Sequence, residues 1–170
     1  MKNYIVLLFM AFSSIAFAQI NKAEIVATGL TCSMCSNAIY KQLQKSPNVE
    51  KVETNLNTNT FTVYYTKDNQ TKPLEIKESI EKAGFFVGSM IVYLPSESLK
   101  SNSKTTLEQD KTTFVFLDGN AKISTNQTKI KILGKGYLTS KDFKKWSQVN
   151  VKKTDFSNSS SNVYYVKLTE

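Results

Sequence analysis

Histidine and arginine are both absent from the 170 residues of this chain, and cysteine occurs only twice. The lack of histidine excludes Ser–His–Asp triads, His-ligated zinc and histidine proton shuttles. With so few cysteines and no histidine, one chain cannot close a four-ligand zinc site of the usual Cys/His kind. Without arginine, the chain lacks the preferred bidentate reader of phosphates and base edges.

The first 18 residues have the pattern of a removable export signal. Lys2 precedes an apolar run over 4–12, and Ala16-Phe17-Ala18 has the small-x-small form of a signal-peptidase site. The apolar run is too short to span a bilayer comfortably, and no second run of spanning length follows. We therefore expect an exported, periplasmic protein that begins at Gln19 after cleavage and makes no stable membrane insertion.

All 22 cationic side chains are lysines, and they are unevenly spread. Residues 20–93 carry eight lysines and seven acids, whereas residues 94–170 carry thirteen lysines and seven acids. The first explanation for the basic excess of the C-terminal part is solubility. The second is binding to an anionic surface or an acidic partner. In an exported protein with so weak a patch, we expect no nucleic-acid binding.

Both cysteines lie in the stretch Gly29-Leu30-Thr31-Cys32-Ser33-Met34-Cys35. A strand-like run over 24–27 precedes it, and a helical pattern follows, in which Cys35, Ile39 and Leu43 are spaced by four. The pattern predicts a strand-to-helix turn with Cys35 in the first helical turn, where the dipole favours a thiolate. Two thiolates on one loop can bind opposite sides of a soft, low-coordinate ion such as Cu(I).

We expect an α+β fold with two domains. Residues 20–93 predict the order β-α-β-β-α-β of a ferredoxin-like domain, with Gly84 ending the second helix. A linker is expected at 94–104, and a small β-rich C-terminal domain of unknown function at 105–170. The expected strands are 24–28, 49–54, 61–65, 85–93, 114–117, 129–132 and 163–168; the expected helices are 33–45, 74–83 and 140–148, the last capped by Thr139 or Ser140.

The N-terminal pattern resembles the heavy-metal-associated domain family, which includes copper chaperones, N-terminal domains of metal ATPases and periplasmic mercury-binding proteins. Residues 29–35 fit the family's Gly-Met-Thr-Cys-x-x-Cys, with Leu30 in place of a packing Met. Further matches at the family's spacing, within residues 22–93, are Ile39, Leu43, Val49, Val52, Asn55, Leu56, Val63, Ile76, Ile80 and residues 83–85.

The resemblance implies a metal-binding protein rather than an enzyme. Cys32 and Cys35 would hold Cu(I), with Hg(II), Ag(I), Zn(II) and Cd(II) as competing ions. The ion would be passed on by ligand exchange, in metal transport or detoxification, with a metal-transporting ATPase or efflux component as partner. The resemblance also places Phe85 beside the metal loop, either as an apolar shield or as a core residue.

Two alternatives stay open. The same Cys-x-x-Cys could serve periplasmic thiol–disulfide exchange, or form a structural disulfide. Alternatively, the C-terminal part could contact a transporter or another periplasmic protein while the N-terminal domain only delivers or senses metal.

The remaining candidates have plainer roles. For Met34 we favour contact with solvent or a partner over a third metal ligand. We expect core packing for Met90, Phe143 and Trp146. Turn or cap roles are expected for the scattered acids Asp118, Asp142 and Asp155.

Overall fold

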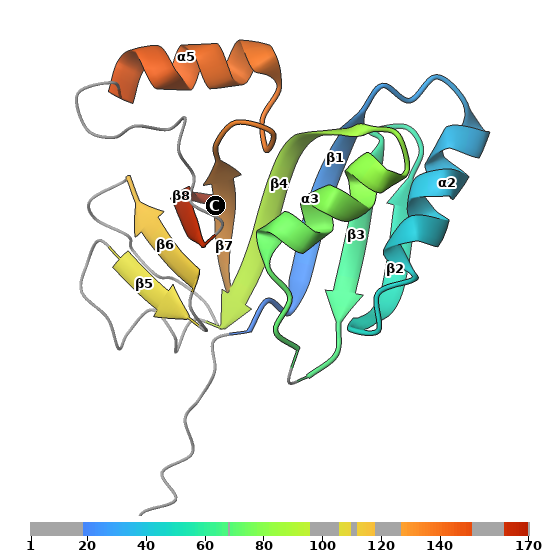
Figure 1. Ribbon diagram of the computed structural model, residues 1–170, viewed down its shortest axis with the longest axis horizontal. Helices are drawn as coiled ribbons and strands as arrows, with labels where there is room; N and C mark the ends of the chain where they lie inside the picture. Colours follow the sequence, from blue (N-terminus) through green and yellow to red (C-terminus); the bar gives the residue numbers. More distant parts are fainter. Residues whose placement is uncertain are drawn as a thin grey trace, which may run out of the picture.

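The computed structural model describes residues 19–67, 69–95, 106–109, 112–117, 127–150 and 162–169 (Figure 1). The elements are β1 Lys22–Thr28, α2 Ser33–Leu43, β2 Val49–Asn55, β3 Thr60–Tyr65, α3 Pro73–Lys82, β4 Phe86–Pro95, β5 Thr106–Gln109, β6 Thr112–Phe116, β7 Gln127–Leu133, α5 Ser140–Asn150 and β8 Val163–Thr169. The order β1 to β4 confirms the predicted βαββαβ unit. The expected export signal, at residues 1–18, lies outside the described residues.

The eight strands form one sheet in the order β2-β3-β1-β4-β7-β8-β6-β5. Neighbouring strands run antiparallel except β6 and β8, which are parallel. Helices α2 and α3 both lie against the N-terminal part of this sheet, on the same face (Figure 1). This is the ferredoxin-like arrangement expected from the sequence, extended by the C-terminal strands.

Strand β7 adds directly to the edge of β4, which the sequence did not predict. The register joins Ile91 to Lys131 and Pro95 to Gln127. Leu94 and Pro95 therefore belong to a strand, and the prediction that they start a linker is wrong. Because β5 to β8 continue the N-terminal sheet, a separate C-terminal β-rich domain is not confirmed.

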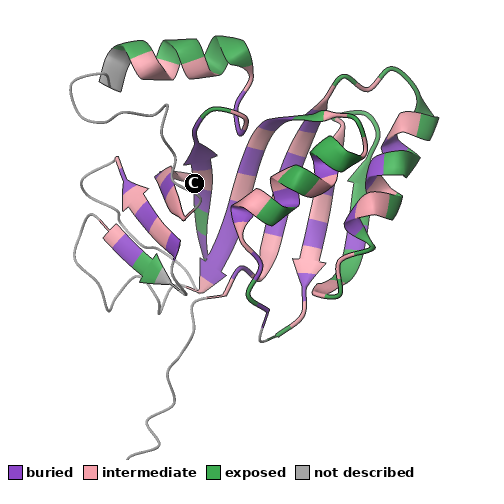
Figure 2. Cartoon of the chain, in the orientation of Figure 1, coloured by how far each residue is buried: buried purple, intermediate pink, exposed green. Residues whose placement is uncertain are grey.

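One hydrophobic core runs through both parts of the sheet. The residues of β1 alternate between buried and half-buried, and the buried ones face the helices. Ile25 and Phe61 share a cluster of buried side chains with Phe114 and Ile130 from the C-terminal strands. Figure 2 shows the buried bands continuing across the sheet. The scaffold of the N-terminal unit thus gains apolar burial from the C-terminal residues.

Helix α3 ends as the sequence predicted. Gly84 has a φ of +90°, a left-handed conformation that glycine adopts without steric cost. The amide of Gly84 donates to the carbonyl of Glu81 at 2.9 Å, and the amide of Phe85 donates to that of Ile80 at 3.2 Å. These two bonds form a Schellman motif, which fixes the position of Phe85 just after the helix.

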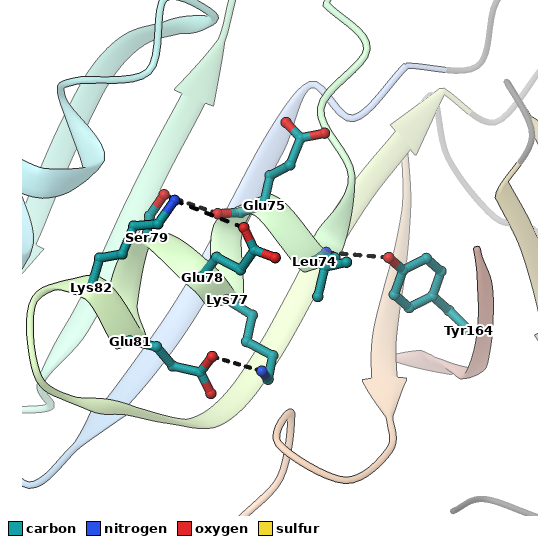
Figure 3. A network of polar contacts seen from close by, with 8 residues as sticks. All are labelled: Leu74, Glu75, Lys77, Glu78, Ser79, Glu81, Lys82 and Tyr164. Carbon is teal, nitrogen blue, oxygen red and sulfur yellow. Dashed lines mark hydrogen bonds and ion pairs between the residues drawn. The ribbon is translucent and has the colours of Figure 1, made fainter. Parts of the chain in front are cut away.

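At the start of α3, a backbone amide finds its hydrogen-bond acceptor on a residue of β8. The helix starts after Lys72, which forms no side-chain capping bond. The Leu74 amide instead donates to the hydroxyl of Tyr164 at 3.3 Å (Figure 3). Tyr164 also meets the ring of Tyr137 edge-on, with ring centres 5.9 Å apart. The C-terminal part therefore contacts the ferredoxin-like unit through α3 as well as through β4.

Helix α5 begins with the predicted cap. The amide of Asp142 donates to the hydroxyl of Thr139 at 3.2 Å, and that hydroxyl donates to the Asp142 carboxylate at 2.8 Å. Among the described residues, no helix is both long and apolar enough to cross a bilayer.

Candidate metal centre

The two cysteines stand on the turn between β1 and α2. Gly29 follows β1 with a φ of +89°, which lets the chain turn sharply without a steric penalty. Cys32 occupies the N-cap position of α2 in an extended conformation, and its side chain caps no backbone amide. The sequence correctly predicted this strand-to-helix turn.

The two sulfur atoms lie side by side as free thiols. Cys32 Sγ is 2.9 Å from Cys35 Sγ, and the amide of Cys35 donates to the carbonyl of Cys32 at 3.1 Å. Cys32 is exposed and Cys35 is half-buried. Both thiols are therefore accessible from solvent and close enough to act on one ion or to form a bond with each other.

The buried stripe of α2 leaves Cys35 at its margin. Ser36, Ile39 and Leu43 are the buried residues of this helix. In the sequence, Cys35 is spaced by four from Ile39 and Leu43. In the structure, Ser36 rather than Cys35 joins these two residues on the buried face of the helix. Cys35 is consequently turned toward the loop and its partner thiol.

The surroundings of Cys35 favour its ionised form. The hydrogen bond with Cys32 lowers the pKa of the Cys35 thiol below its ordinary value of 9.0, and contacts from the Thr31 backbone lower it further. Slight desolvation acts in the opposite direction but is outweighed. Because the first helical turn holds no acidic residue, nothing there competes with a thiolate for the positive end of the helix dipole.

Phe85 lies beside the turn, as the resemblance implied. An ideal Cβ built on Gly29 would be 3.9 Å from Cδ1 of the Phe85 ring. Phe85 is partly buried and also packs against the core cluster. Its packing role is confirmed, while its role as an apolar shield for the thiols stays a prediction.

Three exposed apolar side chains surround this end of the molecule. Met34 is 80% exposed, Phe86 67% and Leu56 56%. Phe86 pairs with Thr28 at the end of β1, and the amide of Ala27 bonds to Asn59 in the turn that contains Leu56. Met34, Phe86 and Leu56 therefore lie at the same end of the sheet as the two thiols.

Sequence reasoning missed Phe86 and Leu56 as parts of this surface. A usable signal was present for Phe86. It follows Phe85 immediately, and adjacent residues at the start of a strand point to opposite sides, so one ring had to face away from the core.

The other sequence candidates lie away from the thiols. Met90 is fully buried, which confirms its core role. Asp142 takes part in the cap of α5, because its carboxylate accepts a bond from the capping hydroxyl of Thr139. Phe143 and Trp146 are half-buried rather than core residues, so that prediction is wrong. Asp118 and Asp155 lie outside the described residues, among which no group of three or more Cys, Asp or Glu side chains could hold a metal ion.

Comparisons with known proteins match the part of the chain that carries the two thiols. A family model for the heavy-metal-associated domain matches residues 25–86. A copper-exporting P-type ATPase of Staphylococcus haemolyticus is 48% identical over 46 residues, which make up 27% of this chain and 6% of the ATPase. This chain therefore matches only a small fraction of that relative's length.

Two solved domains match the same part of the chain. The yeast copper transporter domain Ccc2a, studied in apo and Cu(I)-loaded states, is 39% identical with a TM-score of 0.35, over 38% of this chain and 86% of its own. The N-terminal domain of a potential copper-translocating P-type ATPase from Bacillus subtilis is 33% identical with a TM-score of 0.35, over 39% and 82%. The family match assigns residues 25–86, which include the turn with Cys32 and Cys35, to the heavy-metal-associated domain.

Proposed function

We propose that this protein binds Cu(I) as cargo through Cys32 and Cys35 and passes it to another protein by ligand exchange. The observation that carries the proposal is the pair of free, accessible thiols 2.9 Å apart on the turn before α2. Thiolates are soft ligands and favour Cu(I) over harder ions. Copper is favoured among thiophilic ions because the matching segment of the Staphylococcus relative belongs to a copper-exporting ATPase.

The site fits a two-coordinate ion after a small adjustment. Metal–thiolate bonds of about 2.3 Å would place two sulfurs on opposite sides of one ion about 4.6 Å apart. The sulfurs must therefore separate from their present 2.9 Å. Cys32 can make this movement because it precedes the helix, is exposed, and holds no capping bond.

The exposed rim of the site supports transfer rather than storage. A partner's thiolate can attack the bound ion from solvent, form one new metal–sulfur bond, and displace one of the two cysteine thiolates. The oxidation state of the ion does not change in this step. Met34, Phe86 and Leu56 offer apolar area for a brief contact with that partner, which we expect to be a metal-transporting ATPase or an efflux component.

Export of the protein is part of the proposal. The apolar run over 4–12 and the Ala16-Phe17-Ala18 sequence support cleavage before Gln19 and a periplasmic location. An oxidising compartment tends to join nearby thiols, so a reduced state of the pair is a condition for metal binding there.

A thiol–disulfide exchange protein is the second candidate. The short sulfur–sulfur distance and the lowered pKa of Cys35, caused first by the hydrogen bond with Cys32, favour it as well. Turnover on a reduced substrate would support this function, whereas a metal carrier shows none.

Anaerobic titration of the reduced protein with Cu(I), against a competing chelator, tests the proposal. We expect binding with a dissociation constant below about 1 μM, and its loss in Cys32→Ala/Cys35→Ala. Weaker binding, or equal binding by that variant, would remove the basis for a copper-carrying function.

A further inference from the structure

Lysine and tyrosine alternate in a row across the sheet face that points away from α2 and α3. The register joins neighbouring strands β2, β3, β1, β4 and β7 through Lys51, Tyr64, Lys22, Tyr93 and Lys129. Along β1, β3 and β7, these positions alternate with the buried residues that face the helices. The row therefore lies on the sheet face opposite these two helices, where Tyr93 is buried and Lys51 and Lys129 are exposed.

The lysine in β1 has a complete set of partners. Lys22 Nζ is 2.9 Å from a carboxylate oxygen of Glu24, two residues further along the same strand. The hydroxyl of Tyr93 donates to the same carboxylate at 2.7 Å. Lys22 Nζ also lies 3.8 Å from the centre of the Tyr93 ring. The positive charge is thus neutralised by a carboxylate that a tyrosine holds in place.

The lysine in β2 repeats this arrangement. Lys51 Nζ is 2.6 Å from Glu53, again two residues further along the strand. The hydroxyl of Tyr64 donates to Glu53 at 3.1 Å, and Lys51 Nζ lies 5.8 Å from the Tyr64 ring centre. The same arrangement therefore occurs twice on this face of the sheet: a carboxylate neutralises a lysine beside a tyrosine.

The third lysine of the row lacks its carboxylate. Two residues after Lys129 stands Lys131, and the register places Lys131 directly opposite Lys167 of β8. Among the described residues, the ion pairs include none of these three lysines. Like charges directly opposite each other on neighbouring strands destabilise a sheet. We call Lys129, Lys131 and Lys167 the lysine face.

The surroundings of the lysine face are also positive. The described residues of 106–169 carry seven lysines and two acids. Lys167 Nζ lies 5.5 Å from the centre of the Trp146 ring, so α5 borders the lysine face. Lys129 acts on Glu24 through its charge, whereas Lys22 and Tyr93 both bond to one oxygen of that carboxylate.

We infer that the lysine face binds an acidic protein segment, whose carboxylates take the place that Glu24 and Glu53 take in the first two units. On this same sheet face, the groups that pair with Lys22 and Lys51 are the carboxylates of Glu24 and Glu53. An acidic segment would supply the same kind of group to the lysine face. Lysine also lacks the planar fork with which arginine recognises phosphates.

Fluorescence anisotropy with a labelled oligo-glutamate peptide tests the inference on the full mature chain, with oligo-glutamine as the uncharged probe. Lys131→Glu would complete a third internal unit beside Lys129. We expect it to weaken peptide binding about tenfold or more. The matched control Lys144→Glu makes the same charge change on the exposed side of α5, and should weaken binding less than about threefold. Lys131→Gln should give an intermediate loss.

The fold and the metal site provide independent readouts. Lys131→Glu should melt no lower than the wild type, because it replaces a repulsive pair by an attractive one. Cys32→Ala/Cys35→Ala should bind the peptide normally, because the lysine face lies outside the metal loop.

Three results would overturn the inference. The first is a wild-type protein that ignores oligo-glutamate but binds phosphatidylserine vesicles or single-stranded DNA. The second is an equal loss in Lys131→Glu and Lys144→Glu, which would show only unspecific attraction by net charge. The third is normal binding by both Lys131 variants.

Discussion

Cys35 differs from an ordinary surface cysteine in its immediate neighbours. Its sulfur lies 2.9 Å from that of Cys32, at the start of a helix whose first turn holds no acidic side chain. A thiolate in this position is favoured by the hydrogen bond and by the helix dipole. The reactivity of the site therefore depends on the pair, since Cys32 changes the chemistry of Cys35.

The pH dependence of Cys35 alkylation tests this coupling. The pKa of Cys35 is lowered first by the hydrogen bond with Cys32, so its alkylation midpoint should fall below the ordinary 9.0. In Cys32→Ala the midpoint should move up, as measured with iodoacetamide and mass spectrometry. Because the folded pKa is the lower one, the associated stability is present above the unfolded pKa and fades as the pH falls through the folded value. An unchanged midpoint in Cys32→Ala would contradict the coupling between the two thiols.

Helix α3 connects the C-terminal strands with the metal loop. Its first turn is tied to β8 by the bond between Leu74 and Tyr164. Its last turn ends in the Schellman motif that places Phe85 against Gly29. The position of Phe85 beside Gly29 is thus set by a helix that contacts both parts of the chain.

Tyr164→Phe tests the contribution of β8 to α3. Removing the hydroxyl leaves the partly buried Leu74 amide without its acceptor and also removes the hydrogen bond with Tyr137, so we expect a loss of about 1–2 kcal/mol in the free energy of unfolding by urea. The matched control is Tyr64→Phe, which removes an exposed hydrogen bond to Glu53 and should cost less than about 0.5 kcal/mol. Equal losses in the two variants would mean that the hydroxyl does not stabilise the helix start.

The single sheet makes the two parts of the chain one folding unit at the scale of the whole molecule. β4 pairs with β1 on one side and with β7 on the other. The same core cluster contains Ile25 from β1 and Val166 from β8. Separation of the parts would therefore uncover a long strand edge and a shared apolar face.

Unfolding in urea should accordingly show one transition. Trp146, the single tryptophan, reports on the C-terminal part through its fluorescence. Hydrogen exchange at the amides of β1 reports on the metal-binding part. We expect both probes to give the same midpoint. A plateau between two transitions would instead support the two independent domains expected from the sequence.

Local signals in the sequence predicted the local structure, while long-range pairing escaped them. Gly84 and Thr139 end and begin their helices as predicted, because capping depends on a few adjacent residues. The pairing of Ile91 with Lys131 joins distant segments, and no nearby residue specifies that partner. For the same reason the lysine opposite Lys131 could not be identified before the register was known.

At the metal site, the motif predicted which residues meet but not what surrounds them. Cys32 and Cys35 belong to one turn, so their proximity follows from spacing alone. The exposed position of Leu56 beside that turn depends on the packing of β2 and β3 against β1. The half-buried state of Trp146 likewise depends on what covers its helix, which an amphipathic pattern does not reveal.

X-ray absorption at the copper edge of the Cu(I)-loaded protein tests the central claim most directly. The account predicts sulfur-only coordination by two thiolates. The spectrum should be unchanged in Met34→Leu, because the Met34 side chain is 80% exposed and turned to solvent. Nitrogen or oxygen ligands, or the same spectrum from Cys32→Ala/Cys35→Ala, would contradict a site built by these two cysteines.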